Sequence, residues 1–290
     1  MANLLEERNY YKPFNYPWAF EAYKMQQQMH WMPEEVSLAD DLKDFREKLT
    51  EPNKRLLSQI FRFFTQADVD VCCGYAKHYL PTFNQPEVRM MLASFANMEA
   101  VHQEAYSLLL DTLEFDESEY QMFSEIQAMS DKHDYLTDFN MDTPFEMAKT
   151  MAVYSGFTEG VQLFSSFAIL LNFPRHNLMK GMGQIVTWSI RDETLHVEGM
   201  TNLFREFIRE NPHLWDDKLK YEIYCAAERV VDLEDAFIDT CFKDADIPDL
   251  TADEVKQYIR YIADRRLLGL GLKGIFHSTE NPLGWLDYML

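Results

Sequence analysis

The sequence predicts an all-α fold, because helical signals are long and repeated whereas strand signals are missing. No stretch of useful length alternates polar and apolar residues, and only 10 of the 290 residues are glycine and 11 are proline. Two helix starts carry capping boxes, Thr143–Glu146 and Thr251–Glu254, the first with proline at the first helical position. We therefore expect one helical domain spanning residues 1–290.

The helical elements can be assigned in order along the chain. Residues 1–35 are rich in aromatic side chains but lack periodicity, so we expect an N-terminal arm that packs over the helices. Prolines at 52, 81, 86 and 174 mark starts and stops. The expected helices cover residues 38–49, 52–80, 86–114, 117–134, 143–172 and 215–243. Another follows Pro174 and extends to about 210, and the last begins at 251 and ends near the glycines 269, 271 and 274. The segment 276–290 contains Pro282 and Gly284 and should be irregular.

Composition narrows the class of protein. The chain is 47% hydrophobic and 14% aromatic, which suffices for a large core, and its net charge of -21 argues against nucleic acid or an anionic membrane as a partner. No apolar stretch approaches the roughly 20 residues of a membrane span. The start of the chain does not resemble a leader peptide. The four cysteines fit neither a metal-finger spacing nor a small disulfide scaffold, so we expect reduced thiols and a cytoplasmic protein.

The stretch Ser189–Met200 carries the strongest functional signal. Glu193 and His196 stand three residues apart, about one helical turn, and share their face with apolar Ile190 and Val197. A carboxylate and an imidazole on a buried face need partners, because an unpaired buried charge is costly. The same spacing recurs at Glu99 and His102, again on an apolar stripe.

Two further helices place a single acid at a core position. Asp68 is flanked at helical spacing by Phe64 and Val71, and Glu159 precedes Leu163 in the same register. Two Glu-x-x-His turns with one more acid on each of two other helices form the ligand set of a four-helix di-metal carboxylate bundle. Four carboxylates and two imidazoles suit a pair of Fe or Mn ions, which can bind and reduce O2. The six expected ligands are Asp68, Glu99, His102, Glu159, Glu193 and His196.

Each of these features also has an ordinary structural explanation. A single Glu-x-x-His turn is usually a solvated pair, and a single buried histidine is more often a satisfied core residue than a ligand. Tyr106, one turn after His102 on the same face, is by periodicity alone most simply a core tyrosine. The coincidence of the two matching turns with the two single acids is what favours the metal site.

Several ordered motifs resemble the small, radical-generating subunit of class I ribonucleotide reductase. They are WMPEEV at 31–36, ADVDV at 67–71, MEAVHQEAY at 98–106, FTEGVQLFSSF at 157–167, IRDETLH at 190–196 and ENPLGWLDY at 280–288. The resemblance covers nearly the whole chain. It implies a ferritin-like helical bundle with additional helices, a homodimer, and a large catalytic subunit that reduces ribonucleoside diphosphates with the oxidising equivalent stored in the small one.

The resemblance also implies roles for individual residues. Asp68, Glu99 and His102 would hold one metal ion and Glu159, Glu193 and His196 the other, with an iron pair expected first and Mn/Mn or Mn/Fe as alternatives. Tyr106 matches the radical tyrosine, in a pocket lined by Leu163 and Phe167. Asp192 and Trp31 match the pair through which an electron and a proton leave, with Asp192 accepting a hydrogen bond from His102. The resemblance leaves open whether a flavodoxin-like activator is needed.

Three departures from the family pattern stand out. The family's C-terminal docking peptide and relay tyrosine would begin near residue 290, and Tyr288 is too close to the folded part to replace them. Ser189 stands one turn before Glu193, where an aliphatic residue is common, so its hydroxyl could bond Tyr106. Val71 and Tyr154 match the pair that is cross-linked in the R2-like ligand-binding oxidases, a two-electron alternative on the same fold, although Asp68 and Tyr106 favour the reductase.

Two further alternatives come from other classes. An iron-storage protein would need a shell-forming surface and usually a shorter chain, and the expected helices after residue 215 argue against it. A metal-free bundle would place Glu99 and Glu193 in salt bridges with residues such as Arg191.

Overall fold

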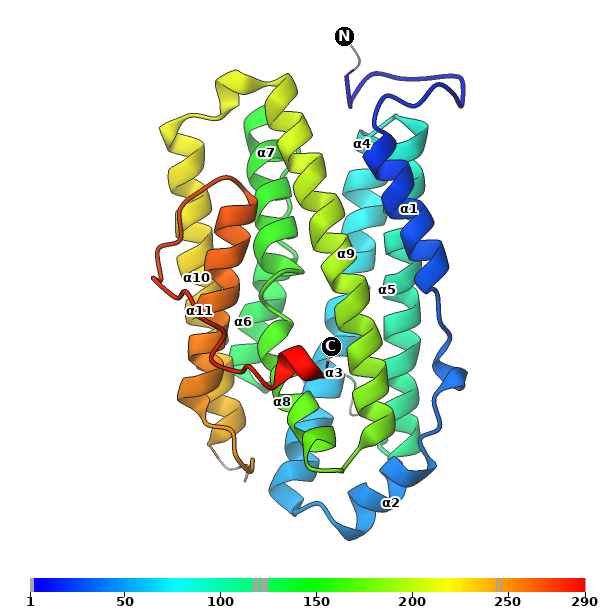
Figure 1. Ribbon diagram of the computed structural model, residues 1–290, viewed down its shortest axis with the longest axis vertical. Coiled ribbons are helices and arrows are strands. Elements are labelled where there is room, and N and C mark those ends of the chain that lie inside the picture. The colour runs from blue at the N-terminus through cyan, green and yellow to red at the C-terminus, as the bar shows by residue number, and fades with distance from the viewer. Residues whose placement is uncertain (1–2, 117–119, 121–124, 244, 246, 290) are drawn as a thin grey trace.

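Long helices lie side by side along the longest axis of the molecule (Figure 1). The computed structural model describes residues 3–116, 120, 125–243, 245 and 247–289, and within them it contains helices, turns and irregular segments but no strand. The α-helices are α1 Pro17–Met29, α2 Ala39–Glu47, α3 Glu51–Gly74, α4 Leu80–Thr82, α5 Pro86–Thr112, α6 Gln127–Leu136, α7 Pro144–Val153, α8 Phe164–Arg175, α9 Lys180–Glu210, α10 Asp217–Phe242 and α11 Ala252–Gly269. The all-α prediction is confirmed.

The helix starts follow from local capping chemistry. The hydroxyl of Thr143 accepts a hydrogen bond from the backbone N–H of Glu146, and Thr251 forms the expected reciprocal box with Glu254. A side-chain cap of this kind typically contributes about 1 kcal/mol. The long helix α9 is capped from outside, since Asp41 of α2 accepts from the N–H groups of both Gly181 and Met182.

The core lies between α3, α5, α9 and the α7–α8 segment, which pack along one another as a bundle. The additional helices α10 and α11 cover one flank and α1 lies along α5 on the other (Figure 1). One continuous cluster of buried apolar side chains joins these elements. No helix among the described residues is long and apolar enough to cross a membrane.

The expected N-terminal arm contains a regular helix that sequence patterning did not reveal. Residues 17–29 form α1, which packs on α5 and α9. It has no side-chain cap, and Ala19 and Gln26 are its only fully buried residues, so no apolar stripe marks it. The polar residue Gln26 faces the interior, which removes the periodic signal on which the prediction relied.

Two of the expected helices also differ from the structure. For the helix expected over 117–134, residues 117–119 and 121–124 lie outside the described part of the chain, and the helix α6 begins only at Gln127 and runs to Leu136. The helix expected over 143–172 is interrupted. After α7 a π-helical turn, Tyr154–Thr158, leads into the non-helical turns 159–163 before α8 begins. The apolar run is continuous across this break, so periodicity could not show it.

The remaining expectations agree with the structure more closely. The helix expected over 52–80 is α3 followed by a π-helical turn, Tyr75–Tyr79. The helices expected over 38–49, 86–114, 215–243 and 251–269 each match within three residues at either end. The one expected after Pro174 begins at Lys180 and ends at Glu210, as expected. The segment 276–290 is irregular over its described residues apart from a short 3₁₀ turn, Leu286–Tyr288.

Candidate metal centre

Four helical segments bring the six predicted ligand residues into one buried region. Asp68 comes from α3, Glu99 and His102 from α5, Glu159 from the turn before α8, and Glu193 and His196 from α9; all are at most 2% exposed. Their donor atoms form two groups within which every pair lies within 4.8 Å. One group is Glu99, Glu159, Glu193 and His196, and the other is Asp68, Glu99 and His102.

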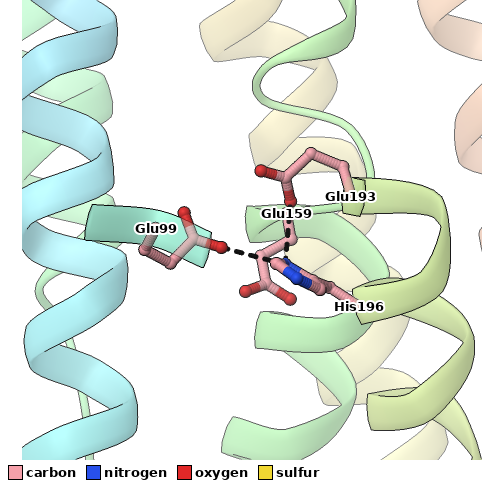
Figure 2. Close-up of side chains that lie close together, drawn as sticks. All are labelled: Glu99, Glu159, Glu193 and His196. Carbon is pink, nitrogen blue, oxygen red and sulfur yellow. Dashed lines mark ion pairs between the residues drawn. The ribbon is translucent and has the colours of Figure 1, made fainter. Parts of the chain in front are cut away.

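Glu99 and Glu193 lie between the two imidazole rings. The Nδ1 atom of His196 is 2.9 Å from Glu99 Oε1 and 3.6 Å from Glu193 Oε2. The Nδ1 atom of His102 is 3.3 Å from Glu193 Oε1 and 3.6 Å from Glu99 Oε2. Figure 2 shows Glu99 reaching toward His196 from α5, on the side opposite to Glu193. Each of the two carboxylates therefore lies within 3.6 Å of both imidazole rings.

The outer nitrogens of both rings are held by polar side chains. Nε2 of His102 lies 3.2 Å from Asp192 Oδ2, and Nε2 of His196 lies 3.1 Å from Gln26 Oε1. Because both partner oxygens can only accept, each Nε2 carries a proton, and Nδ1 is the atom of each ring that faces the centre. Partners of this kind fix the orientation of metal-binding histidines. Gln26 also donates to Asp192 Oδ1 at 3.0 Å, so one amide links both rings.

Several donor atoms that face the centre make no hydrogen bond among the described residues, although they lie close to one another. Asp68 Oδ2, both oxygens of Glu99, Glu159 Oε2, Glu193 Oε2 and His196 Nδ1 are buried without a hydrogen bond. Buried polar atoms are normally satisfied, and buried charges are paired or bind metals. Four carboxylates and two imidazoles in this state fit a pair of divalent cations with borderline preferences, such as iron or manganese.

The pKa values of these residues, with no metal ion bound, reflect the excess of carboxylates over cations in the centre. Burial, with the charge of Glu99 added, raises the pKa of Asp68 well above its usual range, and burial likewise raises the pKa of Glu159. Burial lowers the pKa of His196, but Glu193 and Glu99 outweigh it and raise the pKa to about 10. The carboxylates thus draw protons into the centre, supplying positive charge that metal ions would otherwise provide.

Tyr106 lies in a dry aromatic pocket beside these residues. Its side chain is 1% exposed, its ring stacks on Phe64 with 4.7 Å between centroids, and Phe64 stacks on Phe167 at 5.1 Å. The phenol donates to Ser189 Oγ at 3.2 Å, and that hydroxyl donates to the backbone oxygen of Ile185. Burial, reinforced by Asp68, raises the pKa of Tyr106, so the phenol is protonated at neutral pH.

Trp31 and Asp192 form a hydrogen-bonded path away from His102. The indole Nε1 donates to Asp192 Oδ2 at 2.7 Å, the same oxygen that faces His102 Nε2. The Trp31 ring also stacks over His102 at 6.0 Å and contacts Trp188 at 5.2 Å. The three predicted residues are thus connected side chain to side chain.

Sequence reasoning missed two residues of this region. Gln26 carries no signal for metal chemistry, so its link between Asp192 and His196 was invisible. Tyr75 donates from its hydroxyl to Glu159 Oε1 at 2.6 Å. It stands seven residues, about two turns, after Asp68 on the same helical face, and this spacing could have identified it.

Val71 and Tyr154, the pair of the oxidase alternative, are neighbours. The hydroxyl of Tyr154 donates to the backbone oxygen of Val71 at 2.9 Å, and the Tyr154 ring packs against Tyr75 and Tyr79. This hydrogen bond accounts for the buried phenol without further chemistry.

The comparisons with known proteins agree with this geometry. The family model "Ribonucleotide reductase, small chain" matches residues 8–282. The chain belongs to this family. It is 44% identical to the ribonucleoside-diphosphate reductase small subunit of Invertebrate iridescent virus 6, over 99% of this chain and 91% of that protein. It is 31% identical to the ribonucleoside-diphosphate reductase subunit beta of Chlamydia pneumoniae, over 95% and 83%.

Solved structures of the ribonucleotide reductase family share the ferritin-like fold. The R2 subunit from Clostridium botulinum superposes with a TM-score of 0.89 at 22% identity, covering 97% of this chain and 90% of that one. The dimanganese(II) NrdF of Streptococcus sanguinis gives a TM-score of 0.82 at 21% identity, covering 94% and 97%. These structures show the fold, and the family model and relatives identify the chain as a ribonucleotide reductase small subunit, part of an oxidoreductase.

Proposed function

We propose that the buried cluster holds two metal ions and generates the radical that the large subunit uses to make deoxyribonucleotides. Asp68, Glu99 and His102 would bind one ion and Glu159, Glu193 and His196 the other. The observation that carries the proposal is the set of buried donor atoms without hydrogen bonds, which four helical segments gather into two groups that share Glu99. When bound, the metal pair would supply the electrons for oxygen reduction and a strong oxidant.

The surrounding residues of the chain would then store and move that oxidising equivalent. Tyr106 would hold the radical, because its pocket is dry and Ser189 keeps a hydrogen bond on the phenol oxygen. Asp192 orients His102 and shares its Oδ2 with Trp31 Nε1, so a proton and an electron have a continuous route outward. The alternative is that the metal pair itself retains the oxidising equivalent.

The proposal extends to the ions and partners. An iron pair is the first expectation, with Mn/Mn and Mn/Fe as alternatives, because these ions share nearly the same ligands. A small subunit of this class works with a large catalytic subunit, and a homodimer is typical of its family. We also propose a cytoplasmic location; a flavodoxin-like activator is an expectation that only reconstitution can test.

The test is electron paramagnetic resonance on the metal-loaded protein. Tyr106→Phe should abolish a sharp organic radical signal while two metal ions per chain are retained. Tyr79→Phe is the matched control, because that tyrosine is also fully buried and its hydroxyl makes no hydrogen bond to any described residue. An unchanged sharp signal in Tyr106→Phe would reject the tyrosine assignment, and metal uptake well below two would reject the centre itself.

The relatives do not favour the oxidase alternative, since those compared are named as ribonucleotide reductase subunits. Mass spectrometry of the peptides that contain Val71 and Tyr154 would test it directly. The reductase assignment predicts separate, unlinked peptides.

A further inference from the structure

Two cationic side chains converge on the break that follows Glu159. The backbone between α7 and α8 departs from α-helical geometry at the π-helical turn Tyr154–Thr158 and becomes α-helical again at Phe164. In between, Glu159 N donates back to Tyr154 O, and the N–H groups of Val161 and Gln162 both donate to Phe157 O. Because two N–H groups donate to the same carbonyl, the regular α-helical hydrogen-bond pattern is interrupted for the carbonyls that follow.

Two carbonyls of this break accept from side chains on other helices. Arg266 of α11 donates from Nε to Gly160 O at 3.0 Å, and Lys132 of α6 donates from Nζ to Gln162 O at 2.8 Å. Among the described residues, no backbone N–H donates to either oxygen. A buried carbonyl without a partner costs free energy comparable to a lost hydrogen bond, so these two cations satisfy groups that the break would leave orphaned.

Lys132 is built into the interior, whereas Arg266 is partly exposed. Lys132 is 0% exposed, pairs with Glu234 at 2.7 Å and lies over the rings of Phe63 and Phe237, 4.4 and 4.0 Å from their centroids. The carboxylate of Glu234 accepts a further hydrogen bond from Ser165, at the start of α8.

Arg266 reaches its carbonyl only because residue 160 is glycine. A Cβ at this position would lie 2.3 Å from the backbone oxygen of Gly156 and 2.9 Å from Nε of Arg266. The guanidinium also lies over the ring of Phe164, 5.1 Å from its centroid. The glycine thus permits both the tight turn and the close approach of the guanidinium.

We propose that Arg266 and Lys132 are positioning residues that hold the broken turn, and with it Glu159, in the geometry required for metal binding. Glu159 lies at the start of the break, next to Gly160, and among the described residues its side chain accepts a hydrogen bond only from the hydroxyl of Tyr75. Its placement therefore depends on the backbone of the turn. The inference rests on the proposed role of Glu159 as a ligand.

Mn(II) titration of the metal-free full-length chain tests this proposal. Free Mn(II) is counted by its electron paramagnetic resonance signal. The wild-type chain should bind two ions, whereas Arg266→Met should bind one normally and the second about 10- to 100-fold more weakly, as is typical when a partner behind a metal ligand is lost. Lys132→Met combined with Glu234→Met, which removes the buried pair together, should act in the same direction. Arg266→Lys keeps a donor and should restore binding.

Arg260→Met provides the matched control. Arg260 lies on the same helix as Arg266 and forms a two-pronged pair with Asp235 of α10, at 2.9 and 2.7 Å, without touching the broken turn. It should bind both ions as the wild type does. Amide hydrogen exchange of the metal-free variants gives a second readout. Loss of the hydrogen bond from Arg266 or from Lys132 should speed exchange in residues 159–163 and leave exchange in α9 unchanged.

The outcomes are distinguishable. Normal binding of two ions by Arg266→Met and by the double variant overturns the positioning role, whether or not exchange increases. Equal losses in the Arg260 control also overturn it, because they would indicate general destabilisation. Fewer than two ions in the wild-type chain would instead refute the proposed function. Arg266 and Lys132 lie on different helices, so if one variant does not fold, the other decides. Gly160→Ala disturbs the contact with Arg266 while both cationic side chains remain.

Discussion

Two groups of ionisable side chains are buried in the same bundle, and they differ in charge balance. In the first, Lys132 faces Glu234, so one cation meets one anion and their remaining contacts go to Ser165 and the Gln162 carbonyl. In the second, four carboxylates surround two imidazoles, and several of their atoms face one another without hydrogen bonds.

The difference shows which burial serves structure and which serves function. A buried ion pair can be accommodated when the attraction between its partners offsets the loss of hydration. A set of like-charged groups cannot be accommodated in that way, so the protein must either protonate them or bind cations. The raised pKa values of Asp68 and Glu159 reflect the first solution, and the proposed metal pair is the second.

The largest effect is expected when an acid that both donor groups share is removed from the metal centre. Glu99→Ala takes away the carboxylate that lies within 3.6 Å of both imidazoles. We expect uptake of both metal ions to be lost, because Glu99 belongs to both donor groups. Metal analysis after reconstitution measures this, with exposed Glu104 of the same helix, changed to Ala, as the control. Retention of two ions would show that Glu99 is not a ligand.

The next largest effect concerns the balanced pair. Lys132→Met leaves Glu234 buried without its counter-charge and should lower the free energy of unfolding by about 3–5 kcal/mol. The double change Lys132→Met/Glu234→Met should restore most of that loss, since apolar residues of similar size often replace buried pairs at little cost. Urea unfolding of the metal-free protein measures both. A double variant as unstable as the single one would contradict this account.

The features of the fold and the metal centre that could be predicted are those encoded by residues close together in the sequence. The two Glu-x-x-His turns place their side chains by helical periodicity, so sequence alone brought Glu99, His102, Glu193 and His196 to one region. The threonine caps at 143 and 251 likewise fixed two helix starts. These features depend on residues close together in the chain, which sequence patterns record directly.

The remaining features depend on contacts between distant segments. Gln26 meets Asp192 across 166 residues of chain, and neither the residue type nor its spacing indicates that contact. The break after Glu159 is invisible because the apolar run continues through it, and the cations that satisfy it come from α6 and α11. The packing of distant elements, rather than local propensity, decides both.

A smaller effect should follow from removing a side chain that hydrogen-bonds the predicted ligands from behind. Gln26→Leu removes the acceptor for His196 and a donor to Asp192 while keeping a similar volume. We expect metal affinity to fall about 10- to 100-fold, because both rings lose part of their orientation. Competition with a calibrated chelator measures this. Exposed Gln27, changed to Leu, is the control on the same helix. An unchanged affinity would mean that Asp192 and the ligand backbone suffice.

The smallest effect concerns the phenol that connects the metal-binding region to its aromatic surroundings. Ser189→Ala removes the one hydrogen-bond acceptor that Tyr106 has among the described residues, leaving a buried hydroxyl unpaired. We expect a loss of about 1 kcal/mol in unfolding free energy and unchanged metal uptake. High-field electron paramagnetic resonance should show a shift in the largest g value of the tyrosyl radical, which reports hydrogen bonding to the phenoxyl oxygen. An identical spectrum would mean that Ser189 does not contact the radical, and the aromatic stack of Phe64 and Phe167 would then account for its protection.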